Sequence, residues 1–220
     1  EFKISVTIDK EKKTLTISDN GIGMTEEEVE TYIAQIAFSG AEEFLAKYKD
    51  AEKEAIIGHF GLGFYSAYMV SSKVDIETLS VKEGATPVFW SCDGSSTYQI
   101  DKGKRESRGT DVILHIEEGS EELLQEEKVR ELLNRYARFF AVPIDLNGTP
   151  IKNGDPLWLK SPSSCTDQEY LEFYRSLFPM EPDPIFWIHL NVDYPFKLQG
   201  ILYFPKLDTR FEPSETSIQL

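Results

Sequence analysis

Two glycine-rich segments constrain the fold most, because each lies where a strand or loop pattern must turn into a helix. The first, residues 19–24, follows a strand pattern and precedes a helical one. The second, residues 58–64, has glycine at three of its seven positions and again leads into a helical pattern. Glycine has no Cβ atom, so it permits a sharp turn or the close approach of a ligand to the backbone. The sequence therefore predicts two corners around which a binding site can form.

Alternating apolar residues on both sides of these corners predict strands. Ile4, Val6 and Ile8 alternate with polar residues, and after a charged turn the alternation resumes at Leu15 and Ile17, which predicts a half-buried hairpin. Further alternating segments predict an antiparallel sheet; they are Val74/Ile76, Val88/Trp90, Tyr98/Ile100 and Val112/Leu114/Ile116.

Helical patterns are interspersed among the strands without strict alternation. Thr25 and Glu28 form a capping-box pattern, and apolar residues then recur at helical spacing as far as Ala37. A longer helix is predicted over residues 121–140, and a closing strand over residues 142–146. This order predicts an α+β fold, a two-layer α/β sandwich rather than a doubly wound parallel sheet.

A change of composition after Asn147-Gly148 predicts a second domain. Residues 149–166 are rich in Pro, Ser, Asn and Gly, as linkers between domains often are. We therefore expect one domain over residues 1–148, a linker over 149–166, and the beginning of a second α/β domain over 167–220. In that second part, Phe186 and Trp187 are predicted to belong to the core.

The charge balance limits the classes of partner. The 220 residues include 23 Lys or Arg against 38 Asp or Glu, a formal charge of −15. Such a surface repels a phosphate backbone, so a nucleic acid is not expected as the main partner. No apolar run reaches the roughly 20 residues that span a bilayer, and no signal peptide is visible. The isolated Cys92 and Cys165 favour a reducing compartment, so we expect a cytoplasmic protein without membrane partners.

Both glycine segments have a structural interpretation and a functional one. Residues 19–24 can be a tight turn alone, but Asp19 ends a strand, and a carboxylate there can accept the amino proton of a purine while glycines admit the ring. Residues 58–64 can be helix-packing glycines, yet the amides of residues 61–64 at a helix start also form an anion site. No lysine follows them as in a P-loop, and the βαβ setting of a dinucleotide-binding fold is missing.

The motifs together resemble a known family. They are, in order, Asp19-x-Gly21-x-Gly23-Met24, Ser39-Gly40, Gly58-x-Phe60-Gly61-x-Gly63-Phe64-Tyr65-Ser66 and Arg108-Gly109-Thr110. This order resembles the Bergerat, or GHKL, ATP-binding fold, and within it the ninety-kilodalton heat-shock chaperone family in its bacterial HtpG form. The resemblance covers essentially the whole chain, and the segments 19–25, 36–40 and 57–66 are highly specific to that family.

The resemblance implies a nucleotide site with ATP or ADP as ligand. Asp19 would bind the adenine amino group, with Gly23 and Thr110 in a water-bridged network. Met24, Ile33, Phe64 and Val112 would line the apolar part of the pocket. Residues 39–57 would form a lid that closes over the nucleotide. The implied ATP-binding residues are Asp19, Gly23, Met24, Ile33, Ser39, Gly40, Gly58, Gly61, Leu62, Gly63, Phe64, Thr110 and Val112.

The catalytic groups of the family have no counterpart in these 220 residues. The family's water-activating Glu and magnesium-binding Asn lie on a helix before the first hairpin, and its phosphate-directed Arg lies beyond Leu220. We therefore expect no catalytic or metal-binding residue in this chain, and hydrolysis that is absent or very slow here. In the intact protein we expect ATPase activity with Mg²⁺. Phe38, where many relatives have Lys, predicts weaker binding of the polyphosphate tail.

The resemblance also implies the partners of the intact protein, namely ATP and unfolded or partly folded client proteins, with assembly as a homodimer. An alternative from another class is a non-catalytic interaction module that keeps the fold without nucleotide turnover. Among the remaining side chains, His115 and His189 lie on predicted strands without acidic or cysteine partners in the pattern, which predicts packing roles. Arg105 and Arg108 are assigned no ligand.

Overall fold

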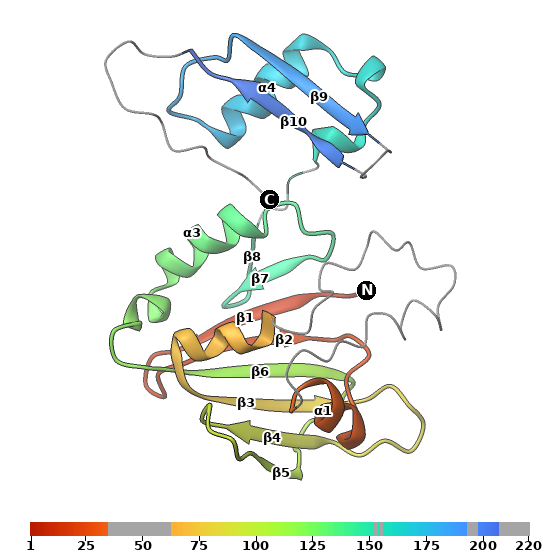
Figure 1. The fold of residues 1–220 in the computed structure, drawn as a ribbon, viewed down its shortest axis with the longest axis vertical. Helices are drawn as coiled ribbons and strands as arrows, with labels where there is room; N and C mark the ends of the chain where they lie inside the picture. Colours follow the sequence, from red (N-terminus) through yellow and green to blue (C-terminus); the bar gives the residue numbers. More distant parts are fainter. Residues whose placement is uncertain (35–62, 152–153, 155, 193–197, 207–220) are drawn as a thin grey trace. The chain divides into compact units, whose positions relative to one another are not determined.

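The computed structural model describes residues 1–34, 63–151, 154, 156–192 and 198–206. The chain divides into two compact units, each described here by itself (Figure 1). The first comprises Glu1–Asn134 and Phe140–Ile151, and the second comprises Arg135–Phe139 and Lys152–Leu220. The predicted domain and linker boundaries at residues 148 and 166 stay predictions.

An eight-stranded sheet forms the centre of the first unit, as far as the structure describes it, in the order β5-β4-β3-β6-β2-β1-β7-β8. Neighbouring strands run antiparallel except β1 and β7, which are parallel. The predicted hairpin and antiparallel sheet are confirmed. The strands are β1 Ile4–Asp9, β2 Thr14–Asp19, β3 Ser71–Leu79, β4 Val88–Cys92, β5 Gln99–Lys102, β6 Gly109–Ile116, β7 Ile144–Leu146 and β8 Thr149–Pro150.

The two faces of this sheet differ in chemistry because side chains alternate along each strand. The register places the apolar side chains of neighbouring strands on one face, which we call the apolar face. Its buried members are Val6, Leu15, Val74, Ile76, Val88, Trp90, Leu114 and Ile116. The opposite face, here the polar face, presents mainly hydroxyl and charged side chains. The predicted α+β sandwich therefore has its core on the apolar face.

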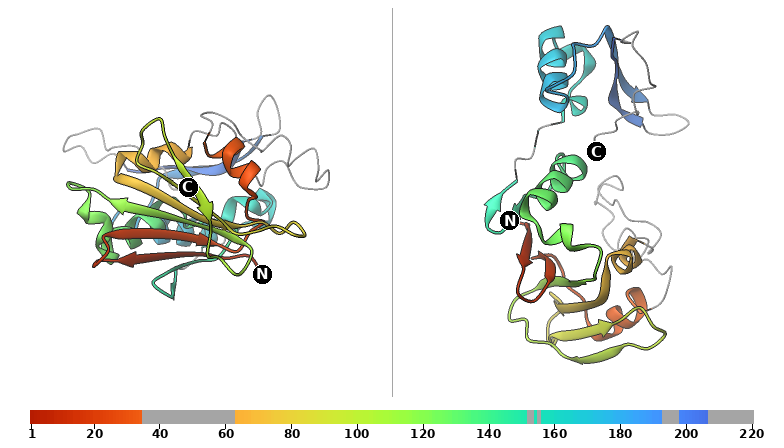
Figure 2. Two further views of the ribbon diagram at one scale, coloured as in Figure 1. Left: turned by 90° about the horizontal axis from the view of Figure 1, so that it is seen from below. Right: turned by 90° about the vertical axis from the view of Figure 1, so that its left-hand side faces the viewer.

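Two helices follow the glycine segments and lie on the same side of the sheet (Figure 2). The helix α1, Glu26–Tyr32, begins with the predicted capping box of Thr25 and Glu28, and its Val29 is fully buried. The 3₁₀ helix η2, Gly63–Met69, packs Phe64 against Trp90 of β4 with ring centroids 5.8 Å apart. The Tyr65 hydroxyl donates to the carbonyl of Ile33 at 2.8 Å, so the end of α1 is fastened to η2.

The helix predicted over residues 121–140 is interrupted and shorter than expected. A 3₁₀ turn, η3 Glu121–Leu124, is followed by α3, Glu126–Tyr136, because Gln125 between them has an extended backbone. The chain leaves helical geometry before Phe139, whose ring contacts Trp158 and Phe173 with centroids 4.6 Å and 5.7 Å away. These aromatic contacts in the second unit compete with continuation of the helix.

In its described residues, the second unit packs one α-helix on a two-stranded sheet. The helix α4, Asp167–Leu177, has a capping box of Thr166 and Glu169 and buries Tyr170 and Tyr174. It is preceded by the 3₁₀ turns η4 Leu157–Leu159 and η5 Pro162–Ser164. The antiparallel strands are β9 Phe186–Val192 and β10 Leu198–Phe204.

The prediction that Phe186 and Trp187 both belong to the core is only half right. Trp187 stacks on Tyr170 of α4, with ring centroids 5.3 Å apart. Phe186 points to the other face, where it stacks on Phe204 at 4.2 Å and stays 48% exposed. Adjacent residues of a strand face opposite ways, so the pair cannot share one core. No helix in the described part of the chain is long and apolar enough to cross a bilayer.

Candidate functional site

Three polar side chains meet at one end of the apolar face. Asp19 ends β2 and pairs with Thr110 of β6, which in turn pairs with Thr78 of β3. The alternation of β2 places Asp19 on the face of Leu15 and Ile17. A carboxylate and two hydroxyl groups therefore adjoin the apolar core, where a polar group is costly unless it has a partner.

A hydrogen-bond network holds the two threonines. Thr78 is fully buried, and its hydroxyl donates to the carbonyl of Gly109 at 3.1 Å. The same hydroxyl oxygen lies 2.9 Å from the hydroxyl oxygen of Thr110. It also accepts the amide proton of Met24 at 2.9 Å. The network thus links β3, β6 and the corner that precedes α1.

Two glycines of this region occupy positions that exclude a side chain. Gly23 has a φ of +62°, and a Cβ there would lie 1.9 Å from the carbonyl oxygen of Leu79. Gly109 has a φ of +122°, and its Cβ would lie 2.1 Å from the carbonyl oxygen of Asp19. Real Cβ atoms do not approach backbone oxygen so closely, so both glycines are needed to bring the corner against β3 and β6.

The Asp19 carboxylate has one oxygen engaged and one without a hydrogen bond, as far as the described residues show. Its Oδ1 accepts the amide proton of Gly21 at 2.7 Å, and within the described residues no hydrogen bond engages Oδ2. Ile17, two residues earlier on the same face, is 40% exposed, and its cross-strand partner Val112 is half-buried. The arrangement can accept a hydrogen bond from a flat, partly apolar ligand and bury the ligand's ring against aliphatic side chains.

Comparison with known proteins identifies the family of this chain. The family model described as histidine kinase-, DNA gyrase B- and HSP90-like ATPase matches residues 2–133, more than half of the chain. This chain belongs to that ATPase family. The model described as Hsp90 protein matches residues 147–216, so the HSP90-like character extends through the second unit.

Relatives from bacteria and a eukaryote align along the chain. The protein named Chaperone protein HtpG from Porphyromonas gingivalis is 51% identical over 235 residues, covering all of this chain and 34% of the relative. The HtpG of Bacteroides fragilis is 48% identical over 240 residues, with 35% of its length covered. The mitochondrial TNF receptor-associated protein 1 homolog of Dictyostelium discoideum is 35% identical over 93% of this chain and 29% of its own length. The chain spans about a third of the length of the curated relatives it matches.

The structure describes eight of the thirteen site residues predicted for this HSP90-like ATPase. Met24 and Thr110 are joined by hydrogen bonds of the Thr78 hydroxyl. Asp19 is the cross-strand partner of Thr110, and Gly23 lies against the Leu79 carbonyl. Val112 lies two residues along β6, and Ile33 ends α1. Gly63 and Phe64 begin η2. Their nucleotide contacts stay predictions. Ser39, Gly40, Gly58, Gly61 and Leu62, with the predicted lid at 39–57 and Phe38, lie outside the described residues.

Sequence reasoning missed Thr78 and Arg105. Thr78 belongs to a strand whose alternation was recognised, but the pattern could not show that its hydroxyl meets Thr110. Arg105 donates to the Asp19 carbonyl at 2.6 Å, across 86 positions of sequence. The only signal for it was a cation close to the Arg108-Gly109-Thr110 motif.

The expectation that His115 lacks an acidic partner is wrong. On the polar face, its Nε2 lies 2.6 Å from Oδ2 of Asp75, whose other oxygen accepts from the Ser91 hydroxyl at 2.6 Å. Burial raises the pKa of Asp75, but hydrogen bonds from Ser91, His115 and Lys73 outweigh burial and hold the pKa below its ordinary value. Residues distant in sequence meet because β3, β4 and β6 are neighbours. His189 has a packing role, with Tyr170 and Trp158 as hydrogen-bond partners.

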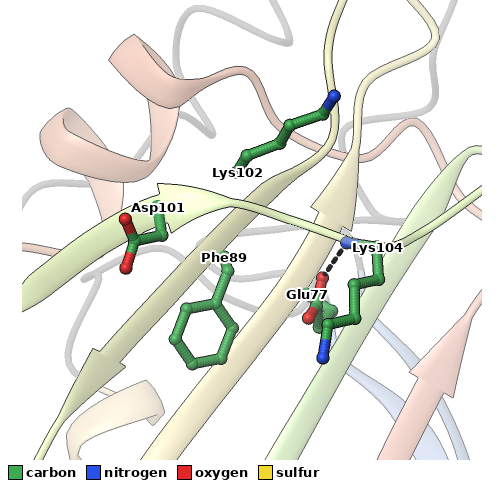
Figure 3. Close-up of a pocket in the computed structure, with 5 residues that line it drawn as sticks. All are labelled: Glu77, Phe89, Asp101, Lys102 and Lys104. Atoms are coloured by element: carbon green, nitrogen blue, oxygen red, sulfur yellow. Dashed lines mark hydrogen bonds between the residues drawn. The ribbon is translucent and has the colours of Figure 1, made fainter.

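A separate hollow lies over β3, β4 and β5, and Figure 3 shows its residues. Phe89 is flanked there by the carboxylates of Glu77 and Asp101, and the Lys104 amide donates to Glu77 at 2.8 Å. None of its lining residues, which also include Lys102, was predicted for the nucleotide site. Among the described residues no group of three or more His, Cys, Asp or Glu could hold a metal ion.

Proposed function

We propose that this chain is the nucleotide-binding part of an ATP-dependent molecular chaperone. The observation that supports this most is the position of Asp19, which ends a strand on the apolar face near Ile17 and Val112. Its Oδ2 has no hydrogen-bond partner among the described residues. In this proposal the Asp19 carboxylate accepts the amino proton of adenine. Gly23 and Thr110 complete the polar contacts through water, and Met24, Ile33, Phe64 and Val112 surround the ring.

The phosphate end of the site is proposed from the resemblance and from the family membership. The backbone amides of residues 61–64 would bind the phosphates of ATP or ADP, with Ser39, Gly40 and Gly58 nearby and residues 39–57 closing as a lid. The start of η2 at Gly63 is fastened to α1 through Tyr65 and Ile33. This contact supports a site in which both glycine segments face one ligand.

The activity of the longer protein is proposed from its relatives. Several of them are named Chaperone protein HtpG, and the matched family is described as an ATPase. We propose that the intact protein hydrolyses ATP with Mg²⁺, assembles as a homodimer and acts on unfolded or partly folded client proteins in the cytoplasm. Binding of nucleotide would then drive closure of the lid and change the affinity for clients.

Titration calorimetry with ADP tests the binding step. The parent chain should bind ADP, and Asp19→Asn should weaken binding about ten-fold or more, because a hydrogen bond to a carboxylate is lost and an amide offers a competing donor. Asp9→Asn is the matched control, because Asp9 lies at the opposite end of the hairpin and, among the described residues, its carboxylate bonds only to Glu11 and Lys12 of its own turn. Equal affinities of the parent chain and Asp19→Asn would contradict the proposed adenine contact.

A further inference from the structure

We propose that Arg105 is a positioning residue for adenine recognition, acting through the backbone of Asp19. The inference rests on the proposed function, because it concerns the same carboxylate. Arg105 does not belong to the predicted site, and its side chain approaches the strand end from the polar face. Its effect on a ligand would therefore be indirect.

The Arg105 guanidinium has several acceptors around it. Its NH2 group donates to the carbonyl of Asp19 at 2.6 Å and more weakly to that of Arg108 at 3.4 Å. Its Nε donates to the carbonyl of Ser107 at 3.1 Å. The NH1 group forms a salt bridge with Asp111, which also accepts from the Ser18 hydroxyl. Only 12% of the Arg105 side chain is exposed, so these contacts are largely shielded from water.

These contacts determine where the Asp19 peptide lies. Asp19 is the last residue of β2, beyond which the chain turns through Asn20 and Gly21. The close approach of Gly109 leaves room for the guanidinium, since a Cβ at Gly109 would lie 2.7 Å from Arg105 NH2. Arg105 binds the Asp19 carbonyl from the polar face, while the Asp19 carboxylate lies on the apolar face. Asp19 therefore has little freedom to rotate away from a ligand.

The choice of arginine follows from the number and directions of the acceptors. A planar guanidinium presents five donors in a fixed fork, so it can pair with Asp111 and bind the Asp19 carbonyl at once. A lysine ammonium has three donors on one atom and cannot reach the same set of acceptors in this geometry. Asp111 stays in place because its strand pairs with both β2 and β3.

The test measures the discrimination between two ligands. ADP carries the 6-amino group that Asp19 is proposed to bind, and the diphosphate of purine riboside lacks it. The parent chain should prefer ADP by about ten-fold. Arg105→Met should lower this ratio to about three-fold or less, and Arg105→Lys should give an intermediate ratio.

Arg108→Met is the matched control. Its exposed side chain contacts only the Phe2 ring among the described residues, with the guanidinium carbon 5.5 Å from the ring centroid. The ratio of affinities in Arg108→Met should therefore match that of the parent chain.

The ratio separates positioning from general stability. If Arg105 only stabilised the fold, its loss would weaken both ligands equally and leave the ratio unchanged, and that result would overturn the inference. If Arg105→Met proves unfolded by circular dichroism, an unchanged ratio in Arg105→Lys would overturn it equally. Asp19→Asn should abolish the preference for ADP. If Asp19→Asn keeps the parent's ratio, the adenine contact of the proposed function fails, and this inference fails with it. If Asp19→Asn abolishes the preference for ADP but Arg105→Met keeps the parent's ratio, the adenine contact stands and only this inference is rejected.

Discussion

Asp19 and Asp75 lie in the same sheet on opposite faces, and their surroundings differ in a way that separates ligand binding from structure. Asp75 is almost buried and has three side-chain donors, the Ser91 hydroxyl, the His115 ring and the Lys73 ammonium. In the described part of the chain, the carboxylate of Asp19 has one donor, the amide of Gly21. A carboxylate whose acceptors are filled by its own protein supports the fold, whereas one with an open oxygen beside apolar side chains suits a ligand.

The largest effect that tests this comparison is expected at the corner of Asp19. Gly23→Ala should destabilise the chain by about 3 kcal/mol or more and abolish ADP binding, because the new methyl group would overlap the Leu79 carbonyl at a positive φ. Gly84→Ala is the control, since Gly84 has a φ of +77° but nothing within 4 Å of its Cβ position. It should cost about 1 kcal/mol. Urea unfolding measures the free energy of unfolding of both variants. Equal losses in Gly23→Ala and Gly84→Ala would show that crowding at Gly23 has no energetic role.

A smaller effect is expected from the threonine network beside Asp19. Thr78→Val keeps the side-chain volume but removes the hydroxyl that hydrogen-bonds with Met24, Gly109 and Thr110. We therefore expect a loss of about 2 kcal/mol in the free energy of unfolding. Thr7→Val on the exposed polar face should change it by about 0.5 kcal/mol or less. A loss in Thr78→Val no larger than that in Thr7→Val would mean that the network does not organise the corner.

The smallest effect is expected at Asp75, and it depends on pH. Asp75→Asn should cost about 1 kcal/mol at pH 7, because charge-assisted hydrogen bonds become neutral ones. The folded pKa of Asp75 lies below its ordinary value of 3.8. The stability from the ionised carboxylate is therefore fully present above that value and is lost as the pH falls through the lower folded pKa.

Urea unfolding of the parent chain and Asp75→Asn, from pH 7 down toward pH 3, measures this dependence. The difference between the two should shrink at the acidic end. Asp101→Asn is the control, because Asp101 has only the Gln99 amide as a donor among the described residues, and its difference from the parent should stay near zero. A difference for Asp75→Asn that grows toward acid would contradict the assignment.

Local features of the fold were predictable because they depend on neighbouring residues. The capping box of Thr25 and Glu28 and the first hairpin follow from short patterns, and the structure confirms them. The interruption at Gln125 was not predictable, because the apolar spacing continues through it. The parallel pairing of β7 with β1 joins segments about 140 residues apart, and no local pattern encodes such a pairing.

The candidate site was predictable in part for the same reason. Asp19, Gly23 and Thr110 belong to sequence motifs, so a resemblance could find them. Thr78, Arg105 and the pairing of Asp75 with His115 could not be found in that way, since their importance comes from contacts across the sheet. Nothing in the sequence near Arg105 indicates that its guanidinium donates to the Asp19 carbonyl, 86 positions away.

The order of residues alone specified the family, the glycine corners and most of the strands, because periodicity and turn chemistry act over a few positions. Tertiary structure decided which carboxylate is enclosed by donors and which has an oxygen without a partner among the described residues. That outcome depends on strand order and register, which place side chains from β2, β3, β4 and β6 within hydrogen-bonding distance of one another. Hydrogen bonds act over about 3 Å, so only the folded chain determines which polar groups become partners.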